Sequence, residues 1–185
     1  MIRELWSNNW LAIKEIVEPD KGVKGYSFLH EKRCGGKIVV LMPYRIDKNN
    51  EAWYLLRKEV TPCWGMDQVV SSITGGVEKD DVIETAIHEL KEEAGYECTA
   101  QELIPLGTTF GTKSTDTVYS IFAIDVSRKQ QGEATGDGSK LEAMAECAWG
   151  KDLDVARSKD PQVAMAWLRL QYHLGRLPAG YTGLL

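Results

Sequence analysis

The sequence lacks any apolar run that approaches the roughly 18 residues needed by a transmembrane helix. It also lacks the uninterrupted apolar core of a signal peptide, because the first ten residues mix Arg3, Glu4 and Ser7 with single apolar residues. We therefore expect a cytoplasmic protein with no membrane partner. The balance of residue types is that of an ordinary globular protein.

The chain has four cysteines, and its 22 Lys and Arg residues are outnumbered by 27 Asp and Glu residues. The cysteines form no C-x-x-C pair and have no nearby histidine at metal-ligand spacing, which predicts reduced and mostly buried thiols. The net charge is −5, whereas a protein that coats nucleic acid needs a basic surface. We expect no nucleic-acid partner, but a small substrate that carries phosphate is compatible with this charge if metal ions neutralise it.

Apolar runs separated by turn-forming residues predict a chain of strands with two long helices. Strands are expected at residues 10–17, 25–31, 37–42, 52–57, 102–106, 118–126 and 143–149, and residues 37–57 form a hairpin. One helix is expected from Asp81 to Gly95 and a second from Asp160 to Leu174. This order favours the α/β (α+β) class, with a sheet between helices. We expect residues 1–35 to form an N-terminal β extension and residues 36–185 to form one domain.

The helix predicted after Asp81 carries a stripe of carboxylates. At about 100° per residue, Glu89, Glu92 and Glu93 fall within an arc of roughly 100°. The opposite side is apolar and should face the core; it consists of Ile83, Ile87, Leu90 and Ala94. Like charges at this spacing repel one another, and Mg²⁺ relieves that repulsion because it prefers a few carboxylates and phosphate oxygens. A solvated acidic face without a ligand is the alternative interpretation.

The segment GGVEKDDVIETAIHELKEEAGY, residues 75–96, resembles the Nudix box. The pattern of that box is G-x5-E-x7-R-E-U-x-E-E-x-G-U, where U is apolar, and the residues that match its end are Glu89, Leu90, Glu92, Glu93 and Gly95. The resemblance implies a Nudix-like α/β/α sandwich with a mixed sheet between helices. It also implies hydrolysis of the pyrophosphate bond in a nucleoside diphosphate linked to another group, with Mg²⁺ as cofactor and Mn²⁺ as a substitute.

Three positions depart from the pattern. His88 stands where the box has arginine, Asp80 where it has its first glutamate, and Thr74 where it has its leading glycine. In the family, the arginine pairs with that glutamate, so we expect Asp80 and His88 to form a shorter version of the pair. These departures support one alternative, a Nudix-fold module that binds a nucleotide without catalysis. A house-cleaning nucleoside triphosphate pyrophosphatase is the other alternative.

The resemblance also implies roles for single residues. Glu89 and Glu93 would be the main metal ligands, and Glu92 a further ligand or the holder of a metal-bound water. The region of Gly76 would contribute a backbone carbonyl to the metal. The metals would neutralise the diphosphate and activate a water, so Glu92 and Glu93 are also the expected catalytic residues.

The matching residues of the box do not by themselves identify the general base or the substrate contacts. In the family the base comes either from the box or from a later loop, and among the late acids Glu142 is our first choice, ahead of Asp137 and Glu146. The candidate substrate-binding residues are Arg57, Lys113 and His88. A charged contact to phosphate is the role considered for Lys113, in a loop expected beside the active site.

The N-terminal strands and the long late loop resemble the Nudix branch that hydrolyses ADP-ribose and nucleotide sugars. In that branch the N-terminal strands often pair with a second subunit, so we expect a homodimer. Trp53, Trp64 and Tyr119 are candidates to stack on a base, although core packing is the default role of an aromatic side chain.

Overall fold

The computed structural model describes residues 1–136, 138 and 140–177, except for the side chain of Glu142. Its strands are β1 (Ile2–Ser7), β2 (Leu11–Glu18), β3 (Val23–Glu31), β4 (Lys37–Ile46), β5 (Ala52–Val60), β6 (Gln68–Ser71), β7 (Ile73–Gly76), β8 (Ile104–Phe110), β9 (Val118–Asp125) and β10 (Glu146–Gly150). Its helices are α1 (Val82–Ala94), α2 (Asp152–Ala156) and α3 (Pro161–His173), with 3-10 turns at Pro19–Lys21, Ala100–Glu102 and Glu142–Met144. None of the helices in these ranges is long and apolar enough to cross a membrane.

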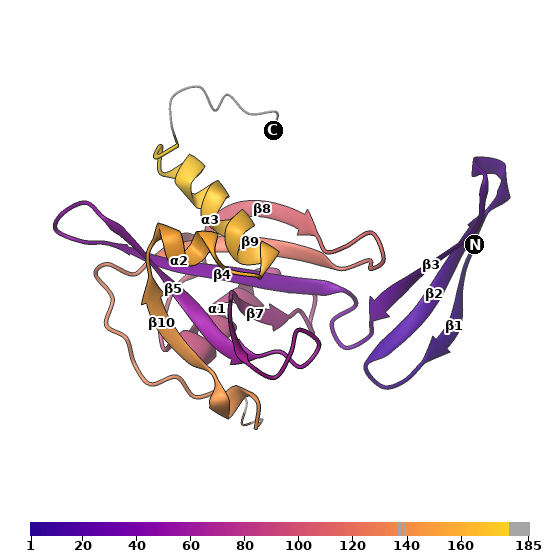
Figure 1. The fold of residues 1–185 in the computed structure, drawn as a ribbon, viewed down its shortest axis with the longest axis horizontal. Helices are drawn as coiled ribbons and strands as arrows, with labels where there is room; N and C mark the ends of the chain where they lie inside the picture. The colour runs from indigo at the N-terminus through magenta and orange to yellow at the C-terminus, as the bar shows by residue number, and fades with distance from the viewer. Residues whose placement is uncertain (137, 139, 178–185) are drawn as a thin grey trace.

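A mixed sheet forms the centre of the molecule (Figure 1). Its main path runs in the order β10-β5-β4-β9-β8, with β6 paired to β5 and β7 paired to β4. The β4–β9 pair is parallel, and the other pairs are antiparallel. The expected hairpin of residues 37–57 is confirmed, because β4 and β5 pair from Tyr44 opposite Tyr54 to Ile46 opposite Ala52.

Helices cover both faces of this sheet. Leu90 of α1 packs on one face, in a buried cluster that includes Val39 and Leu41 of β4 and Leu55 of β5. Side chains from the alternate positions of β4 and β5 point to the other face, where they pack against α2 and α3 in a second cluster. The chain is thus the α/β/α sandwich that the sequence predicts.

Local sequence explains where α1 begins and ends. The Asp81 side chain accepts hydrogen bonds from the backbone amides of Ile83 and Glu84 at 3.0 and 2.9 Å, so it is the N-cap. Gly95 ends the helix with a left-handed φ of 70°, a conformation that is costly for residues with a Cβ. The helix therefore spans the range that was predicted, and its apolar side faces the sheet.

Strands β1, β2 and β3 form a separate antiparallel sheet that extends away from the sandwich (Figure 1). The end of β3 joins it to the segment after β8. Leu29 donates its amide to the Ser114 carbonyl at 2.8 Å and accepts a hydrogen bond from the Asp116 amide at 3.3 Å. His30 Nδ1 lies 2.7 Å from Asp116 Oδ2. These contacts hold the end of β3, and with it the N-terminal sheet, against the segment after β8.

Candidate active site

The three glutamates of α1 lie together on one face of the helix. Glu89, Glu92 and Glu93 are half-buried and line one hollow of about 490 Å³. Leu90, on the opposite side of the helix, has no exposed surface. Burial of the apolar side therefore fixes the rotation of α1 and turns the carboxylates toward the hollow, as the periodicity of the sequence predicts.

The carboxylate of Glu89 lies directly against the backbone of β7. A Cβ built on Gly75 would come within 2.0 Å of Glu89 Oε1, so only glycine leaves room for the glutamate at this position. Gly76 has a different neighbour, since a Cβ there would meet the Cβ of Cys34 at 3.0 Å. The glycine pair of the motif thus combines one residue that accommodates an acidic side chain with one that packs against the segment before β4. Both glycines line the hollow.

A second hollow, of about 370 Å³, lies on the other side of Glu92 and Glu93. Both glutamates line it as well, so they separate the two hollows. The remaining lining comes from β5, from the loop after β9 and from the start of β10; it consists of Arg57, Gln131, Gly132, Ala134, Thr135, Gly136, Gly138, Ala143, Ala145, Glu146 and Cys147. A substrate longer than either hollow could extend past the two carboxylates.

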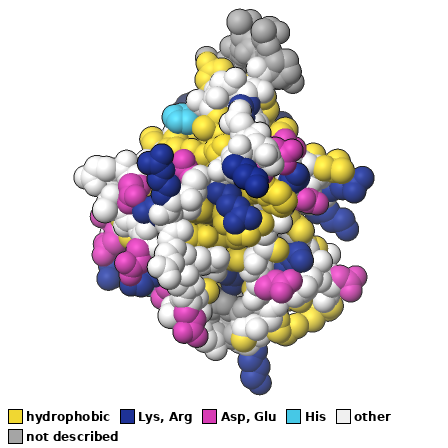
Figure 2. Space-filling model, turned by 90° about the vertical axis from the view of Figure 1, so that its left-hand side faces the viewer, with side chains coloured by type: hydrophobic (Ala, Val, Ile, Leu, Met, Phe, Trp, Pro, Cys, Tyr) yellow, Lys and Arg dark blue, Asp and Glu magenta, His cyan; other side chains and the backbone are white. Residues whose placement is uncertain are grey.

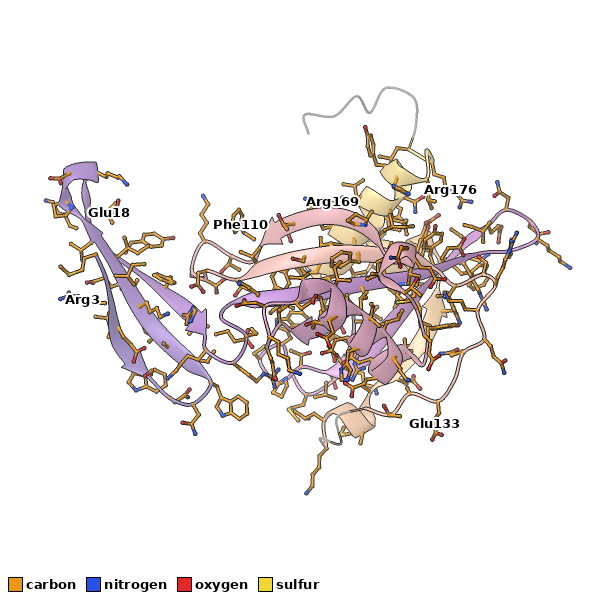
Figure 3. The ribbon with its side chains drawn as sticks, turned by 180° about the vertical axis from the view of Figure 1, so that it is seen from behind. Arg3, Glu18, Phe110, Glu133, Arg169 and Arg176 are labelled. Atoms are coloured by element: carbon orange, nitrogen blue, oxygen red, sulfur yellow. The ribbon has the colours of Figure 1, made fainter. Side chains whose placement is uncertain are left out.

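The loop after β9 is attached to the C-terminal end of α1. The Gly132 amide donates to the Gly95 carbonyl at 2.7 Å, and the Gly136 amide donates to the Glu92 carbonyl at 3.1 Å. These bonds satisfy helix carbonyls that have no partner within the helix. In Figure 3, Glu133 of the same loop points outward. The loop thus forms a wall next to the acidic face.

The late acids considered as general base lie in or after this loop. Asp137 lies outside the described residues, and so does the side chain of Glu142, whose backbone belongs to the 3-10 turn before β10. Glu146 lines the second hollow and lies 3.3 Å from Lys58 Nζ. The choice of Glu142 therefore stays a prediction.

Arg57 is buried next to Glu93. Its side chain is 6% exposed, and Nη1 lies 3.0 Å from Glu93 Oε1 while Nε lies 3.1 Å from Glu59 Oε2. The Cys147 thiol, on the neighbouring strand β10, donates to the Glu93 carbonyl at 3.3 Å. Burial raises the pKa of this thiol to about 11, so it is protonated at neutral pH. Direct contact between Arg57 and a substrate stays a prediction.

The expected pair between Asp80 and His88 is wrong. Asp80 lies before the helix in a conformation with φ of 58°, and its carboxylate contacts Lys37 Nζ at 2.5 Å. This ion pair lowers the pKa of Asp80. His88 lies on α1 beyond its first turn and places Nδ1 3.2 Å from Glu92 Oε2, one turn further along. Lys37 of β4, and not His88, is therefore the partner of Asp80. His88 still lines the first hollow.

The other predicted substrate contacts do not line either hollow. Lys113 is exposed in the loop after β8, where its carbonyl accepts a hydrogen bond from the Tyr26 hydroxyl. Trp64 is 52% exposed in the loop between β5 and β6. Tyr119 packs with the α3 side of the sheet, opposite α1. Contact between these side chains and a substrate stays a prediction.

Trp53 belongs to a cluster of cations and aromatic rings at the β4–β5 end of the sandwich. Lys151 Nζ lies 4.6 Å from the centre of the Trp53 ring, and the Arg45 guanidinium lies 4.2 Å from that of Trp149. Figure 2 shows this end of the molecule, where Lys and Arg side chains gather over hydrophobic ones. The contacts give Trp53 a packing role.

The acidic face fits Mg²⁺ by the chemistry of its donors. Among the described residues, no three His, Cys, Asp or Glu side chains are gathered closely enough to hold an ion. The available groups are carboxylate oxygens and the backbone of β7, whereas Zn²⁺ prefers nitrogen and sulfur. Mg²⁺ binds through one or two carboxylates, several waters and substrate phosphates, so it does not need a preformed protein cage. The residues present are therefore suited to Mg²⁺.

Several features of the site are not evident from the sequence motif. Glu59 and Ser71 lie behind Arg57, and Cys147 lies behind Glu93. The spacing of Arg57 and Glu59 places both on one face of a strand, which is the only available signal for their contact. The partner on β6 could not be found, because that strand was not predicted.

Comparisons with known proteins support the fold. No family model and no curated protein matches the sequence. The structure is similar to the crystal structure of an ADP compounds hydrolase, with a TM-score of 0.69 and 13% sequence identity. The match covers 96% of this chain and 95% of that chain, so it includes the N-terminal sheet as well as the sandwich. The chain therefore has a Nudix-like fold, with a mixed sheet between α1 on one face and α2 and α3 on the other.

Proposed function

We propose that this protein hydrolyses the pyrophosphate bond of a nucleoside diphosphate linked to another group, with ADP-ribose or a nucleotide sugar as the first candidate. The observation that carries the proposal is the arrangement of Glu89, Glu92 and Glu93 on one side of α1, where Gly75 makes room for Glu89. The similar fold of an ADP compounds hydrolase supports an ADP-containing substrate.

Glu89 and Glu93 would be the main ligands of Mg²⁺, Glu92 would be a further ligand or hold a metal-bound water, and the region of Gly76 would add a backbone carbonyl. Bound Mg²⁺ would offset the charge of the diphosphate and make a water acidic enough to act at neutral pH. A metal is needed on electrostatic grounds, since three carboxylates repel a diphosphate and the chain has a net charge of −5. Mn²⁺ should also support hydrolysis in place of Mg²⁺.

The chain's own residues would bind and orient the substrate. The diphosphate would lie at Glu92 and Glu93, because these side chains border both hollows, and the two linked groups would occupy the hollows. His88 and Arg57 line opposite hollows and can offer hydrogen bonds to phosphate oxygens. Glu142 is the proposed base that accepts a proton from the attacking water.

A substrate panel tests the proposal. AMP or phosphate release would be measured from ADP-ribose, nucleotide sugars, dinucleoside polyphosphates and nucleoside triphosphates, each with Mg²⁺, with Mn²⁺ and with EDTA. The proposal predicts metal-dependent release of AMP or another nucleoside monophosphate from a linked diphosphate. Release from the triphosphates alone would identify a house-cleaning enzyme. If no compound of the panel releases product but ADP-ribose raises the melting temperature, the protein is a binding module without catalysis.

We also propose that the protein is a homodimer assembled through the N-terminal sheet. Trp6, Ile13 and Leu29 are register partners across β1, β2 and β3, and they are 53%, 39% and 37% exposed. An apolar row of this kind on one face of a sheet is typical of an interaction surface. A second copy of the same face would cover it.

Light scattering during size-exclusion chromatography tests the dimer. The wild type should have twice the chain mass of 20.7 kDa, and Trp6→Asp should have the mass of the monomer. Trp64→Asp is the control, because Trp64 has a similar exposure of 52% outside the N-terminal sheet. A monomeric wild type would contradict the proposal.

A further inference from the structure

A line of polar side chains connects β6 to the acidic face of α1. The Ser71 hydroxyl donates to Glu59 Oε1 at 2.7 Å, and Arg57 Nε donates to Glu59 Oε2 at 3.1 Å. At the other end, Arg57 Nη1 lies 3.0 Å from Glu93 Oε1. Each side chain thus holds the next one, and the line ends on a carboxylate between the two hollows.

Strand geometry brings these residues together. Arg57 and Glu59 are two residues apart on β5, so their side chains point to the same face of the sheet. Ser71 is the register partner of Arg57 on β6. Glu93 reaches the same place from α1, whose rotation is fixed by its buried side. The contacts therefore follow from backbone pairing and helix packing and do not depend on a mobile loop.

The side chains of this arrangement are largely buried, so solvent screens their contacts only weakly. The exposed fractions of the Arg57, Glu59 and Glu93 side chains are 6%, 28% and 11%. A buried guanidinium needs carboxylate partners, and its planar fork forms directed bonds that a lysine would not reproduce. Because Arg57 is held at Nε by Glu59 and at Nη1 by Glu93, it cannot rotate without breaking one of these contacts. Glu59 therefore restricts the positions that Glu93 can adopt.

We propose that Glu59 is a positioning residue of the site, which orients the Glu93 carboxylate for metal binding through the guanidinium of Arg57. The inference rests on the proposed function, because Glu93 is one of the proposed metal ligands. Partners that hydrogen-bond a ligating carboxylate, as Arg57 does here, orient the ligand before the metal arrives, and Glu59 in turn fixes Arg57. Loss of such a partner typically lowers metal affinity or activity by about 10-fold to 100-fold.

The test measures Mn²⁺ binding to the full chain without substrate, by the electron paramagnetic resonance signal of free Mn²⁺. The variants are Glu59→Gln, which removes the charge with little change in shape, and Ser71→Ala, which removes the donor behind Glu59. Glu51→Gln is the matched control, because Glu51 precedes β5 and forms an exposed ion pair with Lys151 at 2.6 Å. Thermal unfolding is recorded for all of them.

We expect Glu59→Gln to weaken Mn²⁺ binding about 10-fold or more, Ser71→Ala to weaken it less, and Glu51→Gln to leave it unchanged. With a turned-over substrate, Glu59→Gln should lower kcat at limiting metal, and raised Mn²⁺ should restore it without a change in KM for the nucleotide. A general loss of structure would not be reversed in this way.

Wild-type affinity for Mn²⁺ in a folded Glu59→Gln protein would overturn the inference and leave the proposed function intact. If Glu59→Gln does not fold, Ser71→Ala decides, and unchanged binding in that variant overturns the inference. A wild type that binds no Mn²⁺ would refute the proposed metal site, and the inference with it.

Discussion

Replacing Gly75 by alanine should displace the Glu89 carboxylate while leaving β7 in place. The added Cβ would lie 2.0 Å from Glu89 Oε1, whereas ordinary contact begins at 3.4 Å, so the side chain must retreat by about 1.4 Å (3.4 minus 2.0 Å). Gly75 does not have a positive φ, so alanine fits the backbone. A shifted rotamer of Glu89 costs about 0.5–1.5 kcal/mol, which lowers the melting temperature by only a few degrees in a chain of this size.

The loss of catalytic rate should be far larger than the loss of stability, because misplacement of a site group by about 1 Å can lower the rate roughly 100-fold. The assay compares kcat/KM and melting temperature of Gly75→Ala with those of the wild type on the best substrate of the panel. Gly25→Ala is the control, since its Cβ would also meet a glutamate, Glu15 Oε1 at 2.9 Å, but in the N-terminal sheet. Wild-type kcat/KM in Gly75→Ala would refute the role given to the contact between Gly75 and Glu89.

Three further predictions concern stability and reactivity. Leu90→Ala removes a side chain with no exposed surface and should lower the free energy of unfolding by about 2–5 kcal/mol in urea titrations, and a loss below 1 kcal/mol would contradict the packing of α1. Asp81→Ala removes the N-cap and should cost about 1 kcal/mol in the same assay, whereas an unchanged midpoint would contradict the cap. Burial raises the pKa of the Cys147 thiol to about 11, so iodoacetamide at pH 8 should label the exposed Cys63 first. Cys147 should react only as the pH approaches 11. Equal labelling of the two cysteines at pH 8, measured by mass spectrometry, would contradict the burial of Cys147.

Periodicity and capping residues made α1 and its acidic side predictable. The spacing of Glu89, Glu92 and Glu93 depends only on the geometry of a helix, and Asp81 and Gly95 mark its ends through local backbone chemistry. The apolar, buried parts of β4, β5 and β9 were equally clear, whereas the ends of β4 and β5 at Ile46 and Val60 lie beyond the predicted ranges. Features of this kind are local and can be predicted from one sequence.

Short elements and long-range contacts could not be predicted in the same way. β6 and β7 have only four residues each, and β1 has five exposed positions among its six, so none of them has a clear apolar pattern. The contact of Asp80 with Lys37 spans 43 residues of sequence, and its formation left His88 to pair within α1. The contact between Arg57 and Glu93 depends on how β5 packs beside α1, which the sequence pattern does not specify. The prediction of mostly buried cysteines is wrong for Cys63, which is exposed.

The most direct test of the metal-binding acidic face is AMP release from ADP-ribose by Glu93→Gln in the presence of Mg²⁺. The control is Glu97→Gln, which removes an exposed carboxylate just beyond α1 that pairs with Lys91 at 2.8 Å. The wild type and the control should release AMP with Mg²⁺ and not with EDTA, and Glu93→Gln should be slower by roughly 100-fold or more. AMP release by Glu93→Gln at the wild-type rate would contradict the assignment of the α1 glutamates as the catalytic metal site.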